Sequence, residues 1–246
     1  MGALVFDAIS KQSLSDAVFD QLRRRILSDD LQAGQDLPSE RVLCELLKVN
    51  RSAVREAIKR LQQAGLVEVR HGGATQVLDY RQEAGPDLLS SLLVNARGEI
   101  QVDVARSVVR MRQVLSPEIA GDAASQQVPE VAAGLSLICR KMAATKDVLT
   151  LQVLAFEFWD ALVDASNNIA YRLAMNSLRK TYDHIGGLLV QVMERELLDL
   201  ASFEQLAEAV RDGDRQHAFT CAKVYIDSSS AAIYAVLDLI EKDQKQ

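Results

Sequence analysis

Arginines recur at helical spacing in one short region of the chain, and their chemistry is the clearest that the sequence offers. Arg51 and Arg55 lie four residues apart, so both project from one side of a predicted helix over 50–65. Arg41 lies near the start of a second predicted helix. A guanidinium offers paired N–H donors that match a phosphate or the edge of guanine. The spacing therefore favours a nucleic-acid-binding surface over solvated helix charges, which are the usual role of arginines on a helix.

The start of the helix over 50–65 has a second feature that suits an anion. Asn50 and Ser52 lie at its N-terminus, where free N–H groups and the helix dipole favour phosphate. Between Ser39 and Gly73 there are 7 Lys and Arg residues against 4 Asp and Glu, although the whole chain has a net charge of −6. One locally basic segment on an acidic protein is consistent with a DNA-binding region.

These residues need a scaffold, and the spacing of apolar residues predicts three helices to provide it. Helical spacing occurs in the segments 13–31, 39–49 and 50–65. Gly34 and Pro38 separate the first segment from the second, and a short turn separates the second from the third. Helices joined in this way are typical of a helix-turn-helix motif.

The stretch VRHGGATQV, residues 69–77, predicts a small β-hairpin after these helices. Strand-forming residues flank two adjacent glycines, Gly72 and Gly73, which allow the chain to reverse. Arg70 and His71 lie at the predicted tip, where they can reach the phosphate backbone. Three helices followed by a hairpin form a winged helix-turn-helix unit.

After this unit the sequence is helical almost to its end, so we predict a mainly α protein. The predicted winged helix-turn-helix domain covers residues 10–79, a linker covers 80–92, and an all-α bundle of six or seven helices covers 93–246. The longest runs without a charged residue are near ten residues long, whereas a membrane-spanning helix needs ~20 apolar residues. The three cysteines are far apart, as in a reduced cytosolic protein. We expect a cytoplasmic protein without membrane association.

The sequence disfavours two other function classes, an enzyme and a protein-binding bundle. An enzyme is disfavoured because the sequence contains no P-loop, no G-x-S-x-G, no HExxH and no CxxC pair. A bundle that binds only other proteins is disfavoured by the basic predicted helix. We therefore predict a DNA-binding protein that is not an enzyme and needs no cofactor.

The stretch from Asp36 to about Val77 resembles the DNA-binding domain of the GntR family of bacterial transcription regulators. The matching elements are LPSER, VNRSAVREA, RLQQAGLVEV and the HGG of the wing. The resemblance implies a homodimer that binds a palindrome in double-stranded operator DNA. It also implies which residues contact the operator, namely Arg41, Arg51, Ser52, Arg55, His71 and Gly72.

The helical remainder resembles the effector domain of the FadR branch of that family. Most members of this branch bind a metal ion through one Asp and three His. The resemblance places Ala155, Trp159, Phe203 and Tyr225 at those four positions. Ala, Trp and Phe carry no metal-binding atom, so we predict no metal site.

Aromatic residues at these positions predict a mostly apolar interior that takes an apolar ligand with few polar anchors. Stretches such as SVVRMRQVLSPEIA and VYIDSSSAAIY resemble the metal-free members of the branch, which repress or activate fatty-acid metabolism genes. That resemblance implies release from operator DNA by long-chain acyl-CoA. The expected pocket residues are Trp159, Tyr182, Phe203, Tyr225, Ser229 and Ile233.

Two positions of the last predicted helix differ from those metal-free regulators. Ile226 and Ile233 stand where the resemblance would place the Gly and Trp that line the acyl-CoA site. A larger side chain at the first position changes the shape of a pocket there. The alternative is therefore a regulator of the same branch that senses a different apolar or carboxylate effector.

Overall fold

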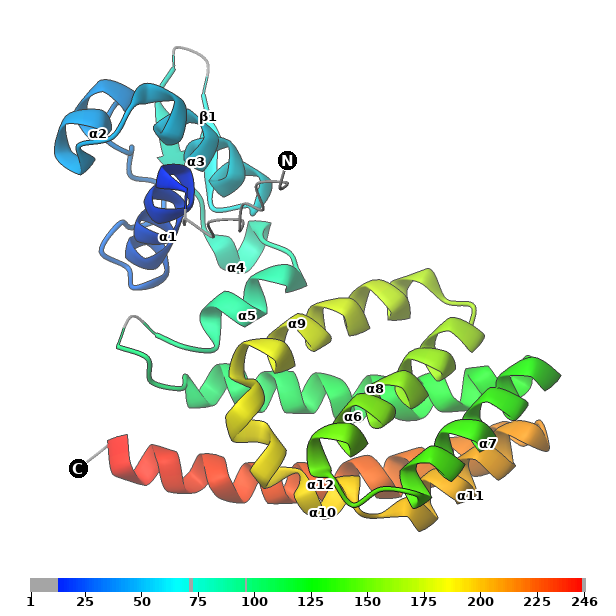
Figure 1. Cartoon of the computed structure of the whole chain (residues 1–246). Coiled ribbons are helices and arrows are strands. Elements are labelled where there is room, and N and C mark those ends of the chain that lie inside the picture. Colours follow the sequence, from blue (N-terminus) through cyan, green and yellow to red (C-terminus); the bar gives the residue numbers. More distant parts are fainter. Residues whose placement is uncertain (1–12, 71–72, 96, 245–246) are drawn as a thin grey trace, which may run out of the picture. The chain divides into compact units, whose positions relative to one another are not determined.

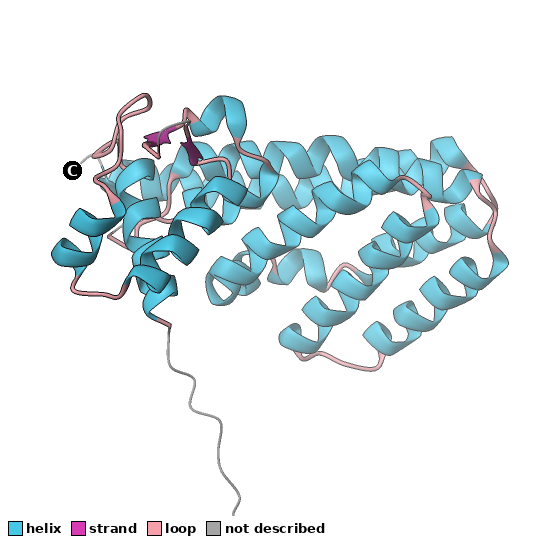
Figure 2. Cartoon of the chain, turned by 90° about the horizontal axis from the view of Figure 1, so that it is seen from above, coloured by secondary structure: helices cyan, strands magenta, loops and turns pink. Residues whose placement is uncertain are grey.

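A computed structural model describes residues 13–70, 73–95 and 97–244 of the chain. The chain divides into two compact units (Figure 1). The first comprises residues 1–88 and 95–97, and the second comprises residues 89–94 and 98–246. Figure 2 shows helices throughout, apart from one pair of short strands. The predicted mainly α class is therefore confirmed.

The first unit begins with three helices: α1 (Leu14–Leu27), α2 (Glu40–Leu47) and α3 (Arg51–Gln63). Polar side chains start each of them. Ser13 and Asp16 form a capping box at α1, Ser39 caps α2 and Asn50 caps α3. Most of the apolar residues with helical spacing are buried, among them Val18, Leu22, Ile26, Val54 and Leu61, whereas Leu14 and Leu46 are exposed.

A two-stranded hairpin completes the first unit. Strand β1 (Val67–Val69) pairs antiparallel with β2 (Thr75–Val77), and Val67 lies opposite Val77. The segment before α2 extends this pairing, because the Leu37 N–H donates to the Thr75 carbonyl at 2.7 Å. The predicted winged helix-turn-helix is confirmed.

Short helices fill much of the segment that the sequence predicts as a linker. They are α4 (Tyr80–Glu83), the 3-10 helix η1 (Pro86–Leu88) and α5 (Leu89–Leu92). Gly65, which follows α3, has φ +69° and lies against the backbone of α4. A Cβ at Gly65 would meet the Glu83 carbonyl oxygen at 2.8 Å, so only glycine fits without a shift.

The second unit is a helical bundle. Besides α5 it contains six long helices and one short helix, α10: α6 (Val102–Ser125), α7 (Pro129–Ala143), α8 (Val148–Ala165), α9 (Ile169–Val192), α10 (Glu194–Leu197), α11 (Leu200–Arg211) and α12 (Arg215–Gln244). Ion pairs from Arg106 to Asp238 and from Glu118 to Arg215 show that α6 and α12 run antiparallel. Among the described residues, no helix is long and apolar enough to cross a membrane.

Two buried clusters form the interior of the bundle. The larger one contains Phe158, Trp159, Phe203 and Tyr225 and joins α6, α7, α8, α11 and α12. A smaller one joins residues 93–109 to the C-terminal half of α12 through Ile233 and Leu237. Both clusters border the cavities described below.

Candidate nucleic-acid interface and ligand cavities

The exposed face of α3 carries the side chains that the sequence predicts to contact DNA. The Asn50 Oδ1 accepts a hydrogen bond from the Ala53 N–H at 2.8 Å and so defines the start of the helix. Ala53 and Val54 are buried, whereas Arg51, Ser52 and Arg55 are exposed. Burial of one face of α3 thus turns its polar face outward.

Glu40 at the start of α2 joins the two arginines of α3. Its carboxylate accepts hydrogen bonds from the Nε of Arg51 at 3.0 Å and from the Nε of Arg55 at 2.9 Å. Partial burial works against the charge of Glu40, but the bonds from both arginines outweigh it and lower the pKa of this carboxyl. These bonds use Nε atoms, so the terminal Nη donors of both arginines take no part in them. Glu40 belongs to the LPSER element but is not one of the predicted site residues.

The remaining predicted DNA contacts lie on α2 and on the hairpin. Arg41 pairs with Glu45 at 2.7 Å on the exposed face of α2. Arg70 follows β1 and is exposed, and its N–H donates to the Ala74 carbonyl at 2.8 Å. His71 and Gly72 lie outside the described residues.

In the second unit, the four residues that the resemblance places at metal-ligand positions lie together. Ala155, Trp159, Phe203 and Tyr225 belong to one buried cluster. The Trp159 and Tyr225 rings stack with centroids 6.3 Å apart, and the Phe203 ring meets Tyr225 edge-on at 5.0 Å. Within the described part of the chain, no group of three or more His, Cys, Asp or Glu side chains is placed to hold a metal ion.

A cavity with charged and aromatic walls opens beside this cluster, and we call it the polar cavity. Its walls include Arg112, Ser116, Trp159, Tyr182, Glu196 and Tyr225. Arg112 and Glu196 form an ion pair although their residues are only 6% and 8% exposed. Nη1 of Arg112 also donates to the Ser229 hydroxyl at 3.1 Å.

The ion pair places charge in an interior that is otherwise mostly apolar. Burial works against the charge of Arg112, but the Glu196 carboxylate outweighs it and raises the pKa of the guanidinium. The guanidinium of Arg112 is therefore charged. Arg112 comes four residues after Val108 and four before Ser116, so it lies on the buried face of α6. That position on an apolar face was the signal that sequence reasoning overlooked.

Two tyrosine hydroxyls lie close to the ion pair, Tyr182 beside Arg112 and Tyr225 beside Glu196. The Tyr182 and Tyr225 hydroxyls are buried, and neither forms a hydrogen bond of normal geometry with a described residue. Burial raises the pKa of both tyrosines, and the Glu196 carboxylate acts in the same direction. Both hydroxyls are thus protonated and able to donate.

Half-exposed ionic residues border the polar cavity between α8 and α9. Asp160 pairs with Arg179 at 2.7 Å and with Arg172 at 2.9 Å. The Arg179 guanidinium also lies over the Phe156 ring, 4.4 Å from its centroid. Asp160, Arg179 and Phe156 all line the cavity.

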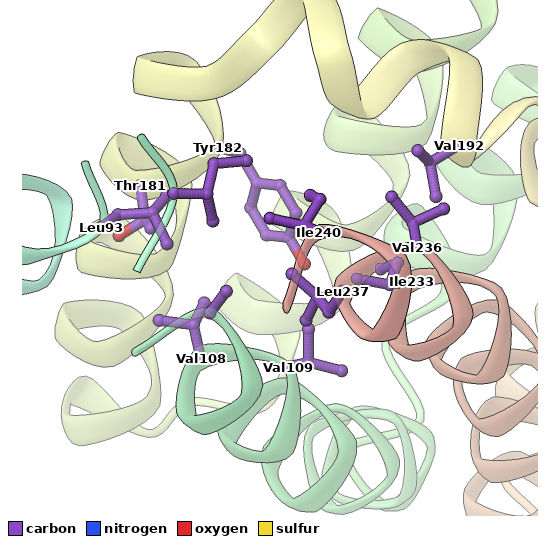
Figure 3. A pocket seen from close by; sticks show the side chains of 12 residues that line it. Leu93, Val108, Val109, Thr181, Tyr182, Val192, Ile233, Val236, Leu237 and Ile240 are labelled. Atoms are coloured by element: carbon purple, nitrogen blue, oxygen red, sulfur yellow. The ribbon is translucent and has the colours of Figure 1, made fainter. Parts of the chain in front are cut away.

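A second cavity, which we call the apolar cavity, is lined almost wholly by hydrocarbon. Its walls include Leu93, Val108, Val109, Tyr182, Ile233 and Leu237. Figure 3 shows the Tyr182 ring reaching from α9 into the space between α6 and α12. Tyr182 lines both cavities and therefore marks the wall that they share.

The six predicted pocket residues divide between these two cavities and the layer behind them. Trp159, Tyr182 and Tyr225 line the polar cavity, and Ile233 lines the apolar cavity with Tyr182. Phe203 packs behind Tyr225, and Ser229 meets the cavity through its bond to Arg112. Ile226 is fully buried in the core.

Comparison with known proteins shows the family. Residues 14–77 match the model for bacterial regulatory proteins of the gntR family, and residues 107–228 match the FCD domain. The chain is also 36% identical to the HTH-type transcriptional regulator Mce2R of Mycobacterium tuberculosis, over 95% of this chain and 97% of that protein. The chain belongs to the GntR family of bacterial transcription regulators. The predictions that this regulator binds DNA through its helix-turn-helix and is not an enzyme are thereby confirmed.

More distant relatives are named as regulators of fatty acid metabolism. The fatty acid metabolism regulator protein of Haemophilus influenzae is 22% identical to this regulator, over 96% of this chain and 97% of that protein. The protein of the same name from Proteus mirabilis is 25% identical over 88% of this chain and 89% of its own. A solved structure of the Listeria monocytogenes protein Lar, 16% identical, shares the fold with a TM-score of 0.59 over 92% of this chain and 99% of that one.

Proposed function

We propose that this GntR regulator binds a palindromic operator as a homodimer and leaves it when an apolar acid enters the two cavities of its FCD domain. One observation carries the proposal for the effector. A cavity walled by hydrocarbon shares Tyr182 with a cavity that contains a buried, charged arginine. Such a pair of cavities suits a molecule with an apolar chain and an anionic head.

On the DNA side, the recognition surface consists of the exposed N-terminal half of α3 and its surroundings. Arg51 and Arg55 are proposed to reach base edges or phosphates, and their bonds to Glu40 keep the two guanidinium groups together. Further proposed contacts come from the start of α3, from α2 and from the wing, at Arg41, Asn50, Ser52, Arg70, His71 and Gly72. A homodimer would present this surface twice, matching the symmetry of a palindrome.

On the effector side, long-chain acyl-CoA is one member of the proposed ligand class, and control of fatty-acid metabolism genes would follow from it. The relatives named fatty acid metabolism regulator proteins, at 22% and 25% identity, support a ligand derived from fatty acids. The buried Arg112 favours the alternative, a different apolar carboxylate, because a free carboxylate has its charge at the end of the apolar chain, whereas the charges of an acyl-CoA lie on the phosphates of its CoA part, away from the neutral thioester. The proposed binding residues are Trp159, Tyr182, Phe203, Tyr225, Ser229 and Ile233.

A thermal-shift screen of the full-length protein separates these ligands. It compares long-chain acyl-CoAs, free fatty acids, small carboxylates and metal ions, each at several concentrations. A ligand that binds only the folded state raises the melting temperature with its concentration. We expect the fatty acids to raise it most. A rise with small hydrophilic carboxylates or metal ions, and none with apolar acids, would contradict the proposed ligand class.

A further inference from the structure

The buried ion pair of Arg112 and Glu196 brings a carboxylate of the protein itself into the polar cavity. Both oxygens of Glu196 face Nη atoms of Arg112, and the Oε2–Nη1 distance is 3.5 Å. A guanidinium binds a ligand carboxylate in the same two-pronged way. Glu196 thus occupies the position that suits an acidic ligand.

The surroundings of the pair contain more hydrogen-bonding capacity than Glu196 uses. The buried hydroxyls of Tyr182 and Tyr225 lie near Arg112 and Glu196 but form no hydrogen bond of normal geometry with a described residue, and Tyr225 is only 6% exposed. Buried hydroxyls usually have a hydrogen-bond partner, and leaving one unpaired is unfavourable. Both tyrosines line the cavity beside Arg112. An anion with oxygens outside the reach of Glu196 would supply the missing acceptors.

The element that carries Glu196 is a short one. Helix α10 has four residues and connects α9 to α11, whereas Arg112 lies in the middle of the 24-residue helix α6. Ser229, the other partner of Arg112, belongs to the 30-residue helix α12. Arg112 and its partner Ser229 therefore lie on long helices, whereas Glu196 lies on a short connecting helix.

We infer that Arg112, Ser229, Tyr182 and Tyr225 form an anion-binding subsite that Glu196 fills in the ligand-free protein, and that the carboxylate of the effector takes this subsite by displacing Glu196. The inference rests on the proposed function for its ligand class, an apolar acid. Replacing one carboxylate by another keeps Arg112 paired throughout, which avoids an isolated buried charge. The displaced Glu196 moves α10, and with it the ends of α9 and α11.

Calorimetric titration of the full-length protein with decanoate tests this inference, and decanol serves as a probe of the same chain length without a carboxylate. The key variant is Glu196→Gln, which keeps the side-chain shape but removes the competing charge. Glu194→Gln is the matched control, because Glu194 lies on the same short helix and is exposed. The double variant Arg112→Gln/Glu196→Gln removes the subsite's charge and leaves a neutral pair.

Competition predicts a specific pattern of affinities. Glu196→Gln is expected to bind decanoate about tenfold more tightly than the wild type, which corresponds to ~1.4 kcal/mol. Decanol affinity stays unchanged, and Glu194→Gln behaves as the wild type. The double variant does not show this tenfold increase in affinity for decanoate. The inference is overturned if folded Glu196→Gln binds decanoate no better than Glu194→Gln does. It is also overturned if Glu196→Gln raises the affinity for decanol as much as the affinity for decanoate.

A measurement on the wild type covers the case in which Glu196→Gln does not fold. Hydrogen–deuterium exchange at saturating decanoate is expected to quicken in residues 194–198, because Glu196 leaves Arg112. Unchanged or slower exchange there overturns the inference. Neither experiment involves DNA, so decanoate can bind as expected and still fail to release the operator. That result would refute the proposed function while leaving the subsite intact.

Discussion

At the scale of single residues, both proposed sites, the DNA-binding surface and the polar cavity, are built around arginine. Arg51 and Arg55 are exposed and share one carboxylate, Glu40, whereas Arg112 is buried with a carboxylate of its own. The exposed pair was predictable from a spacing of four residues on one helix. The buried pair was not, because Arg112 and Glu196 are 84 residues apart and only the packed bundle brings them together.

Replacing Arg51 with alanine tests the recognition helix. We expect Arg51→Ala to weaken operator binding by at least about 1–3 kcal/mol and to reduce the dependence of affinity on salt. Stability should change by less than about 0.5 kcal/mol, since the side chain is exposed. Fluorescence anisotropy and urea unfolding measure the two effects, with Arg25→Ala on α1 as the control. A large loss of stability would show that Arg51 has a structural role instead.

The carboxyl of Glu40 gives a prediction about pH. Its pKa is lowered in the folded protein, so it stabilises the fold above the pKa of the unfolded chain, and this contribution disappears as the pH falls through the folded value. The wild type is therefore expected to lose more stability between pH 7 and pH 4 than Glu40→Gln does. Urea unfolding at the two pH values measures the difference. Equal losses would show that Glu40 is not held by Arg51 and Arg55 in solution.

At the scale of secondary-structure elements, apolar spacing predicted the long helices and the hairpin, but it missed the short ones. The predicted bundle of six or seven helices corresponds to the six long helices α6, α7, α8, α9, α11 and α12. Helices α4, α5 and α10 have four residues each, which is too short for a 3.6-residue period to show. That failure matters at α10, since it carries Glu196.

The close contact after α3 gives a prediction at this scale. Gly65→Ala is expected to destabilise the protein by more than about 1 kcal/mol, because the new Cβ meets a carbonyl oxygen and φ is positive. Gly85→Ala is the matched control, since nothing lies within 4 Å of its Cβ position and its φ is not in the positive range. Urea unfolding compares the two variants. Equal stabilities would contradict the contact between Gly65 and α4.

At the scale of the whole molecule, charge and function are divided between the two units. The first 80 residues are neutral overall and include the basic segment around α3, so the net charge of −6 lies in the helical remainder. An acidic effector domain disfavours non-specific attachment to DNA and leaves binding to the helix-turn-helix. The sequence alone supported this division, because motif and charge pattern coincide. It did not reveal the two cavities, which arise from side chains on five different helices.

We propose that filling of these cavities releases the regulator from DNA, and the operator affinity with and without ligand measures that release. An operator is first selected from random DNA by the protein itself. Anisotropy then gives its affinity for the wild type and for Arg112→Gln/Glu196→Gln, each with decanoate, with a long-chain acyl-CoA and without ligand. A ligand shifts the equilibrium only by its differential affinity for the two states.

We expect decanoate to weaken operator binding by the wild type about tenfold or more. The double variant is expected to bind the operator with normal affinity, and decanoate should leave that affinity unchanged. Undiminished operator affinity of the wild type at saturating decanoate and saturating acyl-CoA would contradict the account.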